Sequence, residues 1–176
     1  MNALSRLVRA LAKAGIGLAA ATLIASMLLI AYAVVMRYFV NQPPPWVDEL
    51  VGYLLVAAVM LAAADALLEG EHIAVDILTD RLGARGRKAV LLGGLVAVAA
   101  TGVLLLREGV DMVAFSRMVG LKSNGFLAVP MWLPQLLVPI GAALLTAAAI
   151  VAFIDAWRGR VGGADSAASH RPARIE

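Results

Sequence analysis

The sequence predicts an all-α membrane protein with four transmembrane helices and a short interfacial amphipathic helix between the second and the third. About 62% of its 176 residues are hydrophobic, which exceeds the roughly 45–50% typical of soluble domains. The charged residues are sparse, and they cluster between long uncharged runs. Such runs are typical of helices in lipid, where each backbone polar group must be satisfied within its own segment.

The first two spans are expected at about 14–36 and 46–68, at roughly 20 residues for each crossing. Basic residues precede the first run, but about 23 apolar residues exceed the 7–15 of a cleavable signal. We therefore expect a retained span. The intervening 41–45 segment holds three prolines, which cannot continue a helix. The two spans should therefore be antiparallel neighbours.

Three acidic residues belong to the second span. Asp48 and Glu49 fall in its first turns, where carboxylates complement the helix dipole. Asp65 follows Glu49 by about 24 Å of helix at roughly 1.5 Å per residue. Against a hydrocarbon core of about 30 Å, both carboxylates can lie near opposite interfaces. Asp65 is therefore expected to serve packing or a partner contact rather than proton transfer.

A polar-faced segment follows the second span. At 100° per residue, His72, Asp76 and Asp80 share one face, and Ile73 and Ile77 lie away from it. This pattern predicts an amphipathic helix at about 72–82 in the interface plane. A basic cluster over 81–88 follows it.

The third and fourth spans are expected at about 89–111 and 131–157. Trp132 and Trp157 bracket the fourth as interfacial anchors, and Pro139 should kink it. Small residues recur every four positions in the second span (Ala58, Ala62, Ala66) and in the third (Gly93, Ala97, Thr101), which favours close helix approach in lipid. Residues 1–158 thus form one transmembrane domain. The Gly-, Ala-, Ser- and Arg-rich tail, 159–176, is expected to be disordered in the cytoplasm.

Orientation follows from the basic residues. The N-terminus, the loop between the second and third spans, and the tail together hold about eleven of the 15 Lys and Arg residues. The positive-inside rule then places both termini in the cytoplasm. The expected location is the bacterial inner membrane.

The residues exclude several kinds of chemistry. There is no cysteine, so thiolate metal sites and cysteine nucleophiles are absent. No span holds a histidine that could bind haem, and His72 lacks the cluster that a metal requires. No nucleophile has an adjacent base, and no nucleotide motif is present. We expect no enzyme, catalytic residue, cofactor or nucleic-acid partner.

Two alternatives can be weighed against an accessory subunit. A stand-alone four-span exporter similar to small multidrug transporters would carry an acid in its first span, and this span has none. A haem or quinone redox subunit would show a visible absorption band. A chain that transports alone usually has broken helices or polar groups at the midplane, and none is evident.

One family matches this pattern. The run Arg37-Tyr38, then Pro45-Trp46-Val47-Asp48-Glu49-Leu50, then 70–76 with sequence GEHIAVD resembles the small membrane subunit, DctQ, of TRAP transporters. These are the tripartite ATP-independent periplasmic systems. The resemblance covers nearly the whole chain apart from the first dozen residues and the tail.

The resemblance implies a scaffold function in secondary transport. Such systems import organic acids, commonly carboxylates, with a sodium gradient. A large permease subunit, DctM-like, moves the substrate, and a periplasmic binding protein, DctP-like, captures it. The small subunit would steady the large one among membrane lipids. The family motif positions carried over as subunit-contact candidates are Arg37, Trp46, Glu49, His72 and Asp76.

Overall fold

The computed structural model describes residues 3–69 and 84–158, and every long element in them is a helix. These are α1 (Ala3–Phe39), α2 (Trp46–Glu69), α4 (Ala84–Val119), the short α5 (Trp132–Gln135) and α6 (Leu137–Trp157). Four stretches are long and apolar enough to cross a membrane: α1, α2, α4 and α5 with α6. The all-α class with four spans is therefore confirmed. The predicted interfacial helix at 72–82 and the tail at 159–176 lie outside the described residues.

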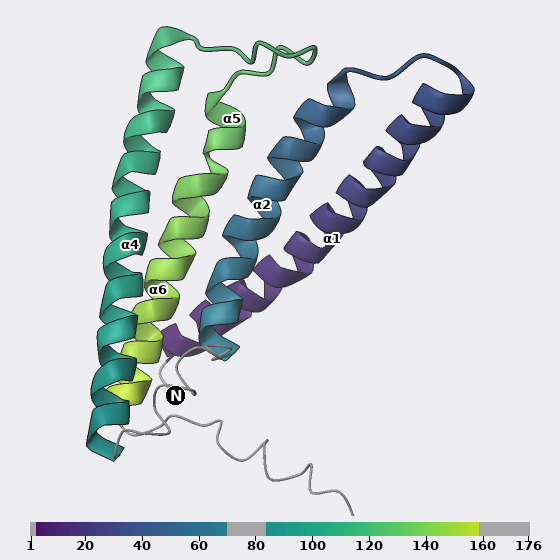
Figure 1. Cartoon of the computed structure of the whole chain (residues 1–176). Coiled ribbons are helices and arrows are strands. Elements are labelled where there is room, and N and C mark those ends of the chain that lie inside the picture. Colours follow the sequence, from purple (N-terminus) through teal and green to yellow (C-terminus); the bar gives the residue numbers. More distant parts are fainter. Residues whose placement is uncertain (1–2, 70–83, 159–176) are drawn as a thin grey trace, which may run out of the picture.

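The helices form two hairpins, α1 with α2 and α4 with α5 and α6 (Figure 1). The central helices α2 and α6 pack against each other, and α1 also reaches α6 near its N-terminus. The hairpins converge at the end that holds the N-terminus and diverge toward the opposite end (Figure 1). The triple-proline turn thus makes α1 and α2 antiparallel neighbours, as predicted.

Two helices are longer than the predicted spans. α1 has 37 residues and α4 has 36, so each is roughly 54–56 Å long at about 1.5 Å per residue. A hydrocarbon core of about 30 Å cannot contain such a helix upright, so each must tilt or extend past the core. Because α4 continues to Val119, Ser116 and Arg117 belong to the helix. The connection to α5 therefore begins at Gly120.

The fourth span is interrupted near its start. α5 ends at Gln135 and α6 begins at Leu137. Pro139 has no N–H with which to bond the Gln135 carbonyl, four residues earlier. Leu136 keeps a right-handed helical conformation with φ −58° and ψ −25°. The fourth span is therefore interrupted one turn before Pro139, the residue expected to kink it.

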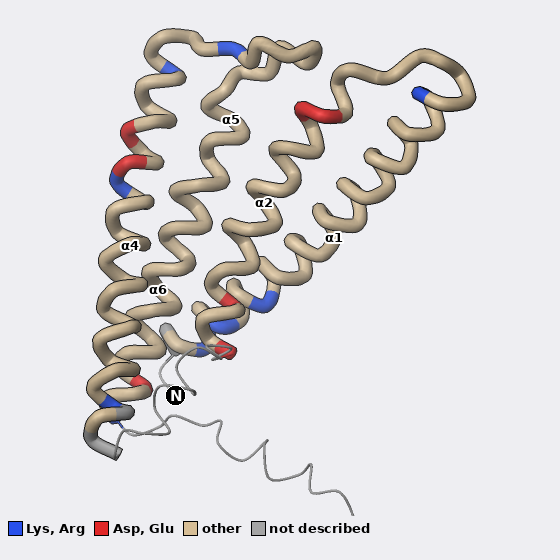
Figure 2. The backbone as a smooth tube through the Cα atoms, in the orientation of Figure 1, with Lys and Arg blue, Asp and Glu red and all other residues tan. Residues whose placement is uncertain are grey.

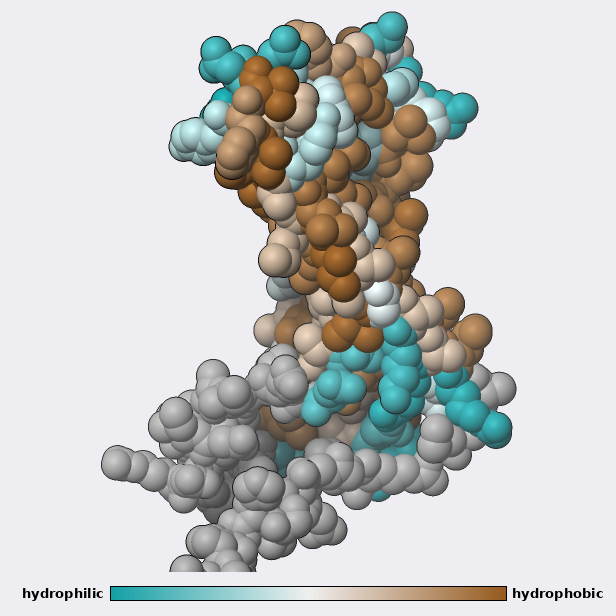
Figure 3. All heavy atoms as spheres, turned by 90° about the vertical axis from the view of Figure 1, so that its right-hand side faces the viewer, coloured by the Kyte–Doolittle hydropathy of each residue, from teal (hydrophilic) through white to brown (hydrophobic). Residues whose placement is uncertain are grey.

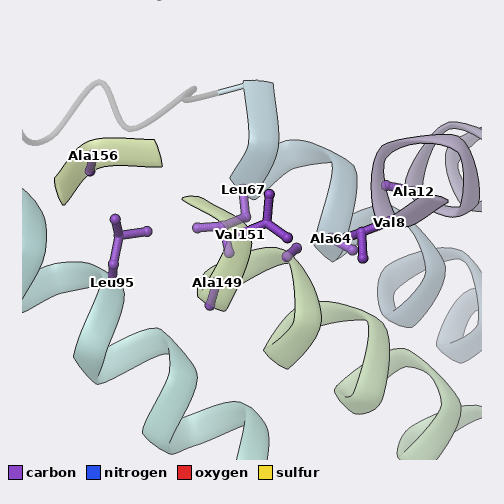
Figure 4. Packing of buried hydrophobic residues seen from close by; sticks show 9 residues of the cluster. Val8, Ala12, Ala64, Leu67, Leu95, Ala149, Val151 and Ala156 are labelled. Atoms are coloured by element: carbon purple, nitrogen blue, oxygen red, sulfur yellow. The ribbon is translucent and has the colours of Figure 1, made fainter. Parts of the chain in front are cut away.

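The main hydrophobic core lies at the end where the hairpins converge. It contains Val8 and Ala12 from α1, Ala64 and Leu67 from α2, and Leu95 from α4. Four small residues of α6 complete it: Ala148, Ala149, Val151 and Ala156. Figure 4 shows these side chains meeting between four helices. Small side chains allow the helix backbones to approach closely, which replaces the missing hydrophobic driving force in lipid.

Glycines mark the closest helix contacts. A Cβ at Gly15 would lie 2.7 Å from the Leu61 carbonyl oxygen, and one at Gly141 would lie 2.6 Å from Met60. The small-residue stripes predicted from the sequence lie only partly at these helix contacts. Ala58 of α2 is buried, but a Cβ at Gly93 of α4 would meet nothing within 4 Å. Spacing alone shows which residues share a helix face, not which face is covered.

The surface is apolar along the helices and charged at their ends. Figure 2 shows Lys, Arg, Asp and Glu gathered toward the two ends of the molecule. The charged residues of α4 extend furthest along their helix. From the side on which α1 lies, an apolar band separates two hydrophilic ends (Figure 3). In α1 and α4, only 11% of the most apolar window is buried, against 39% in α2. The outer helices therefore present apolar side chains to lipid or to a partner.

Candidate functional site

The most connected polar group in the described chain is the carboxylate of Glu49, in the first turn of α2. The Tyr53 hydroxyl, one turn later, donates to Glu49 Oε1 at 2.7 Å. The backbone N–H of Leu127 donates to Glu49 Oε2 at 3.1 Å. The Ser123 side chain also interacts with this carboxylate. Two donors, one from its own helix and one from a distant segment, fix this carboxylate against that segment.

The segment that Glu49 binds is a compact hairpin loop between α4 and α5. Leu121 and Met131 are joined by a backbone hydrogen bond of 2.9 Å, and Ser123 and Val129 by another of 2.9 Å. Lys122 and Pro130 form an isolated antiparallel bridge between these pairs. The loop at 120–131 is therefore internally hydrogen bonded.

Two residues of this loop have a left-handed backbone. Gly120 has φ +66°, and Ala128 has φ +44°. A non-glycine residue adopts this conformation at a cost and persists in it only when its surroundings impose it. The N–H of Ala128 bonds the Gly125 carbonyl at 3.4 Å, so the turn at the loop tip is closed despite this cost.

Gly125 lies directly against the Glu49 carboxylate. A Cβ at this position would overlap Glu49 Oε2 and Cδ. The Gly125 N–H bonds the Ser123 hydroxyl at 3.0 Å, so Ser123 connects the carboxylate and the turn. Only glycine allows the backbone to come this close. The turn at Ser123, Asn124 and Gly125 thus has a specific role in receiving Glu49.

This cluster joins the two hairpins at the end where they diverge. Glu49 and Tyr53 belong to the first hairpin, and Ser123, Leu127 and Met131 belong to the connection within the second. The Tyr53 hydroxyl also lies 3.8 Å from the Met131 sulfur. Figure 1 shows the α4–α5 loop extending toward the start of α2.

Neither of the other motif positions that the structure describes, Arg37 and Trp46, hydrogen bonds the Glu49 carboxylate. Trp46 packs its ring against Tyr32 of α1, with 6.4 Å between centroids and 38° between planes. Arg37 is exposed in the last turn of α1. His72 and Asp76 lie outside the described residues. Trp46 thus steadies the α1–α2 turn, one turn before Glu49.

Asp65 lies near the opposite end of α2 and is only 4% exposed. Its neighbours Ala64 and Leu67 belong to the main core. Asp65 is therefore buried beside the core at the converging end, and its expected role in packing or a partner contact stays a prediction.

Hydroxyl groups within the spans bond their own helices. Thr22 donates to the Ala19 carbonyl, Ser26 to that of Thr22 and Thr146 to that of Ala142, at 2.7–2.8 Å. Such back-bonding satisfies a hydroxyl locally. Among the described residues, no group of His, Cys, Asp and Glu could hold a metal ion. The hydroxyls of Thr22, Ser26 and Thr146 are therefore already hydrogen bonded within their own helices.

An apolar groove of about 490 Å³ lies between α4 and the start of the fourth span. The residues that line it are Val110, Val113, Ala114, Arg117, Met118, Leu136 and Pro139. The Arg117 guanidinium stands over the Trp132 ring at 5.7 Å. Arg117 is the one charged residue that lines this groove, and it is already stacked on Trp132; the other lining residues are apolar. The groove therefore offers a solute no set of polar ligands.

Comparison with known proteins decides the family. A family model described as "Tripartite ATP-independent periplasmic transporters, DctQ component" matches residues 26–159, most of the chain. The chain belongs to the DctQ family. It is also 32% identical over 100 residues to the C4-dicarboxylate TRAP transporter small permease protein DctQ of Rhodobacter capsulatus. That match covers 57% of this chain and 44% of the relative.

DctQ membership confirms the resemblance seen in the sequence. The DctQ component is a multi-pass membrane subunit of a transporter and not an enzyme. The matched region includes α2, the Glu49 cluster and the whole second hairpin. The residues matched by the family model therefore include both the helix that carries Glu49 and the loop that its carboxylate contacts.

The sequence identified Glu49 but not its partners. Tyr53 follows it by one helical turn, which is a recognisable signal for a contact on one face. Ser123, Gly125 and Leu127 are more than 70 positions away, so no local spacing indicates them. Their turn composition was the only available signal.

Proposed function

We propose that this DctQ-family chain is the small permease subunit of a sodium-coupled TRAP transporter that imports organic acids, carboxylates by class. Its partners are a large permease subunit, which carries the solute, and a periplasmic binding protein. Both termini are cytoplasmic in the bacterial inner membrane. The segment 72–82 lies on the membrane surface as an interfacial helix.

The proposal rests on the family to which the chain belongs, together with the exposed apolar surface of its helices. The family is that of a transporter component, and the hydroxyls of Thr22, Ser26 and Thr146 in the described spans bond their own helices. Large apolar side chains such as Met27 and Leu104 are 74% and 59% exposed. Contact with a larger membrane subunit would bury part of this surface, which favours a scaffold role.

The motif positions are assigned to assembly. Trp46 and Glu49 organise the start of α2, and Arg37 lies close to the same turn in sequence. His72 and Asp76 follow the second span. We propose all five as residues that shape the fold or contact the other subunits. The carboxylate class rests on the family's general substrate and on the C4-dicarboxylate named for the Rhodobacter relative.

Co-purification and reconstitution test the proposal. The large permease co-expressed with this chain should remain bound to it in mild detergent. Proteoliposomes with both subunits should take up radiolabelled succinate only with the loaded binding protein outside and an inward sodium gradient. Uphill flux by this chain alone would instead support a stand-alone transporter.

A further inference from the structure

We propose that Glu49 is a positioning residue that presets the 120–131 loop, and that Phe126 at the tip of this loop is a docking contact for the binding protein. The inference rests on the proposed function, because it needs the tripartite assembly and a loop that faces outward.

The backbone on either side of Phe126 is fixed. The Gly125 N–H bonds the Ser123 hydroxyl at 3.0 Å, and the Leu127 N–H bonds Glu49 Oε2 at 3.1 Å. Glu49 contacts both the residue that anchors Gly125 and the residue that follows Phe126. The bulky side chain between these two anchors therefore has a defined direction.

Phe126 itself remains 78% exposed. Leu127 beside it is 37% exposed, and Lys122 and Asn124 are also exposed. The tip therefore presents one aromatic ring beside polar groups. Aromatic anchors within a polar rim are the usual centres of protein interfaces.

A protein partner explains the rigidity better than lipid does. Insertion of a ring into lipid has no directional requirement, so a mobile loop would serve equally well. Docking onto a protein loses less entropy when the contact is already ordered. The cluster includes a carboxylate held by two donors and a left-handed alanine, and an ordered loop of this kind suits a specific protein contact.

The first experiment measures the loop. The natural chain has no cysteine, so spin labels at Gln42→Cys and Asn124→Cys would report a single distance. In nanodiscs with the large permease, the distance distribution should be narrow and should broaden in Glu49→Ala. Gly125→Ala should broaden it too, but should add nothing in the Glu49→Ala background, because its clash is with that carboxylate. Glu108→Gln, an exposed carboxylate of α4, is the control.

The second experiment measures docking. Surface plasmon resonance with the same nanodiscs would give the affinity for the binding protein. Phe126→Ala should weaken it about tenfold, which is typical of an interface anchor, and Glu49→Ala should weaken it similarly. Phe39→Ala removes a ring that is 84% exposed at the end of α1 and should leave the affinity unchanged. Glu49→Gln should restore part of the loss, because its amide oxygen still accepts one hydrogen bond.

Each part of the inference can fail separately. An unchanged distance distribution in Glu49→Ala would overturn the positioning role. A broadened loop with unchanged affinity would overturn the docking role, as would a bimane label at Phe126→Cys that lipid-bound quenchers reach in the assembled complex. Loss of the large permease from the wild-type preparation would instead show that the proposed function itself has failed.

Discussion

The guanidinium of Arg9 lies 3.0 Å from the carboxylate of Asp155, in the only ion pair among the described residues. It joins an early turn of α1 to the last turn of α6, at the end where the hairpins converge. The Glu49 cluster lies at the other end. Polar contacts thus join the hairpins near both ends, and small apolar residues pack between them.

Loss of the Arg9–Asp155 pair should destabilise the fold only slightly. The side chains are 43% and 24% exposed, and such pairs contribute up to about 1 kcal/mol. Asp155→Asn should therefore lower the thermal midpoint in detergent by a few degrees. The exchanged pair, Arg9→Asp with Asp155→Arg, should recover most of the loss, because each new charge also suits the dipole of its helix end. A drop as large as that from a core cavity would contradict this assignment.

Two glycines of α1 provide a matched test of helix contact. At Gly15 an added Cβ would lie 2.7 Å from the backbone oxygen of Leu61, whereas at Gly17 it would meet nothing within 4 Å. Gly15→Ala should destabilise the protein by about 1–3 kcal/mol, because a backbone atom cannot move aside. Gly17→Ala should be neutral or stabilising, because alanine favours the helix by about 0.5–1 kcal/mol. Equal effects in denaturation of the two variants would show that α1 does not pack on α2 here.

A clash against a side chain should be easier to relieve than one against backbone. A Cβ at Gly102 would overlap the Thr146 hydroxyl oxygen across the α4–α6 contact. Gly102→Ala should therefore lower stability, and Thr146→Ala should restore it in the double variant. The hydroxyl bonds only its own helix, to the Ala142 carbonyl, so its removal alone should cost less than about 1.5 kcal/mol. If Thr146→Ala does not restore stability, the strain introduced by Gly102→Ala does not come from this hydroxyl.

The proposed orientation can be read by labelling. Single cysteines at Asn124 and Arg158 lie at opposite ends of the fourth span, and both positions are exposed. In intact spheroplasts, an impermeant maleimide should label Asn124→Cys at once and Arg158→Cys only after lysis. The reverse pattern would place both termini outside and remove the basis for loop docking.

The sequence was sufficient for the class, the number of spans and the hairpin at the prolines. These depend on long uncharged runs and on a residue type that cannot continue a helix. Helix ends were less predictable: α1 and α4 continue past the apolar windows, because a helix does not end where the hydrocarbon does. Pairing between helices was least predictable, since the loop residues that contact Glu49 lie 74 or more positions along the chain, where no local spacing indicates them.

The divergence of the two hairpins has a mechanical consequence. A molecule whose helices meet at one end and spread at the other takes up unequal areas in the two leaflets. A wider spread of the hairpins therefore requires work against the lateral pressure of the lipids. Lipids that prefer a curved monolayer should change the spread that is most favourable. Thinner or more strongly curved bilayers should thus alter the spread of the hairpins even without a change in sequence.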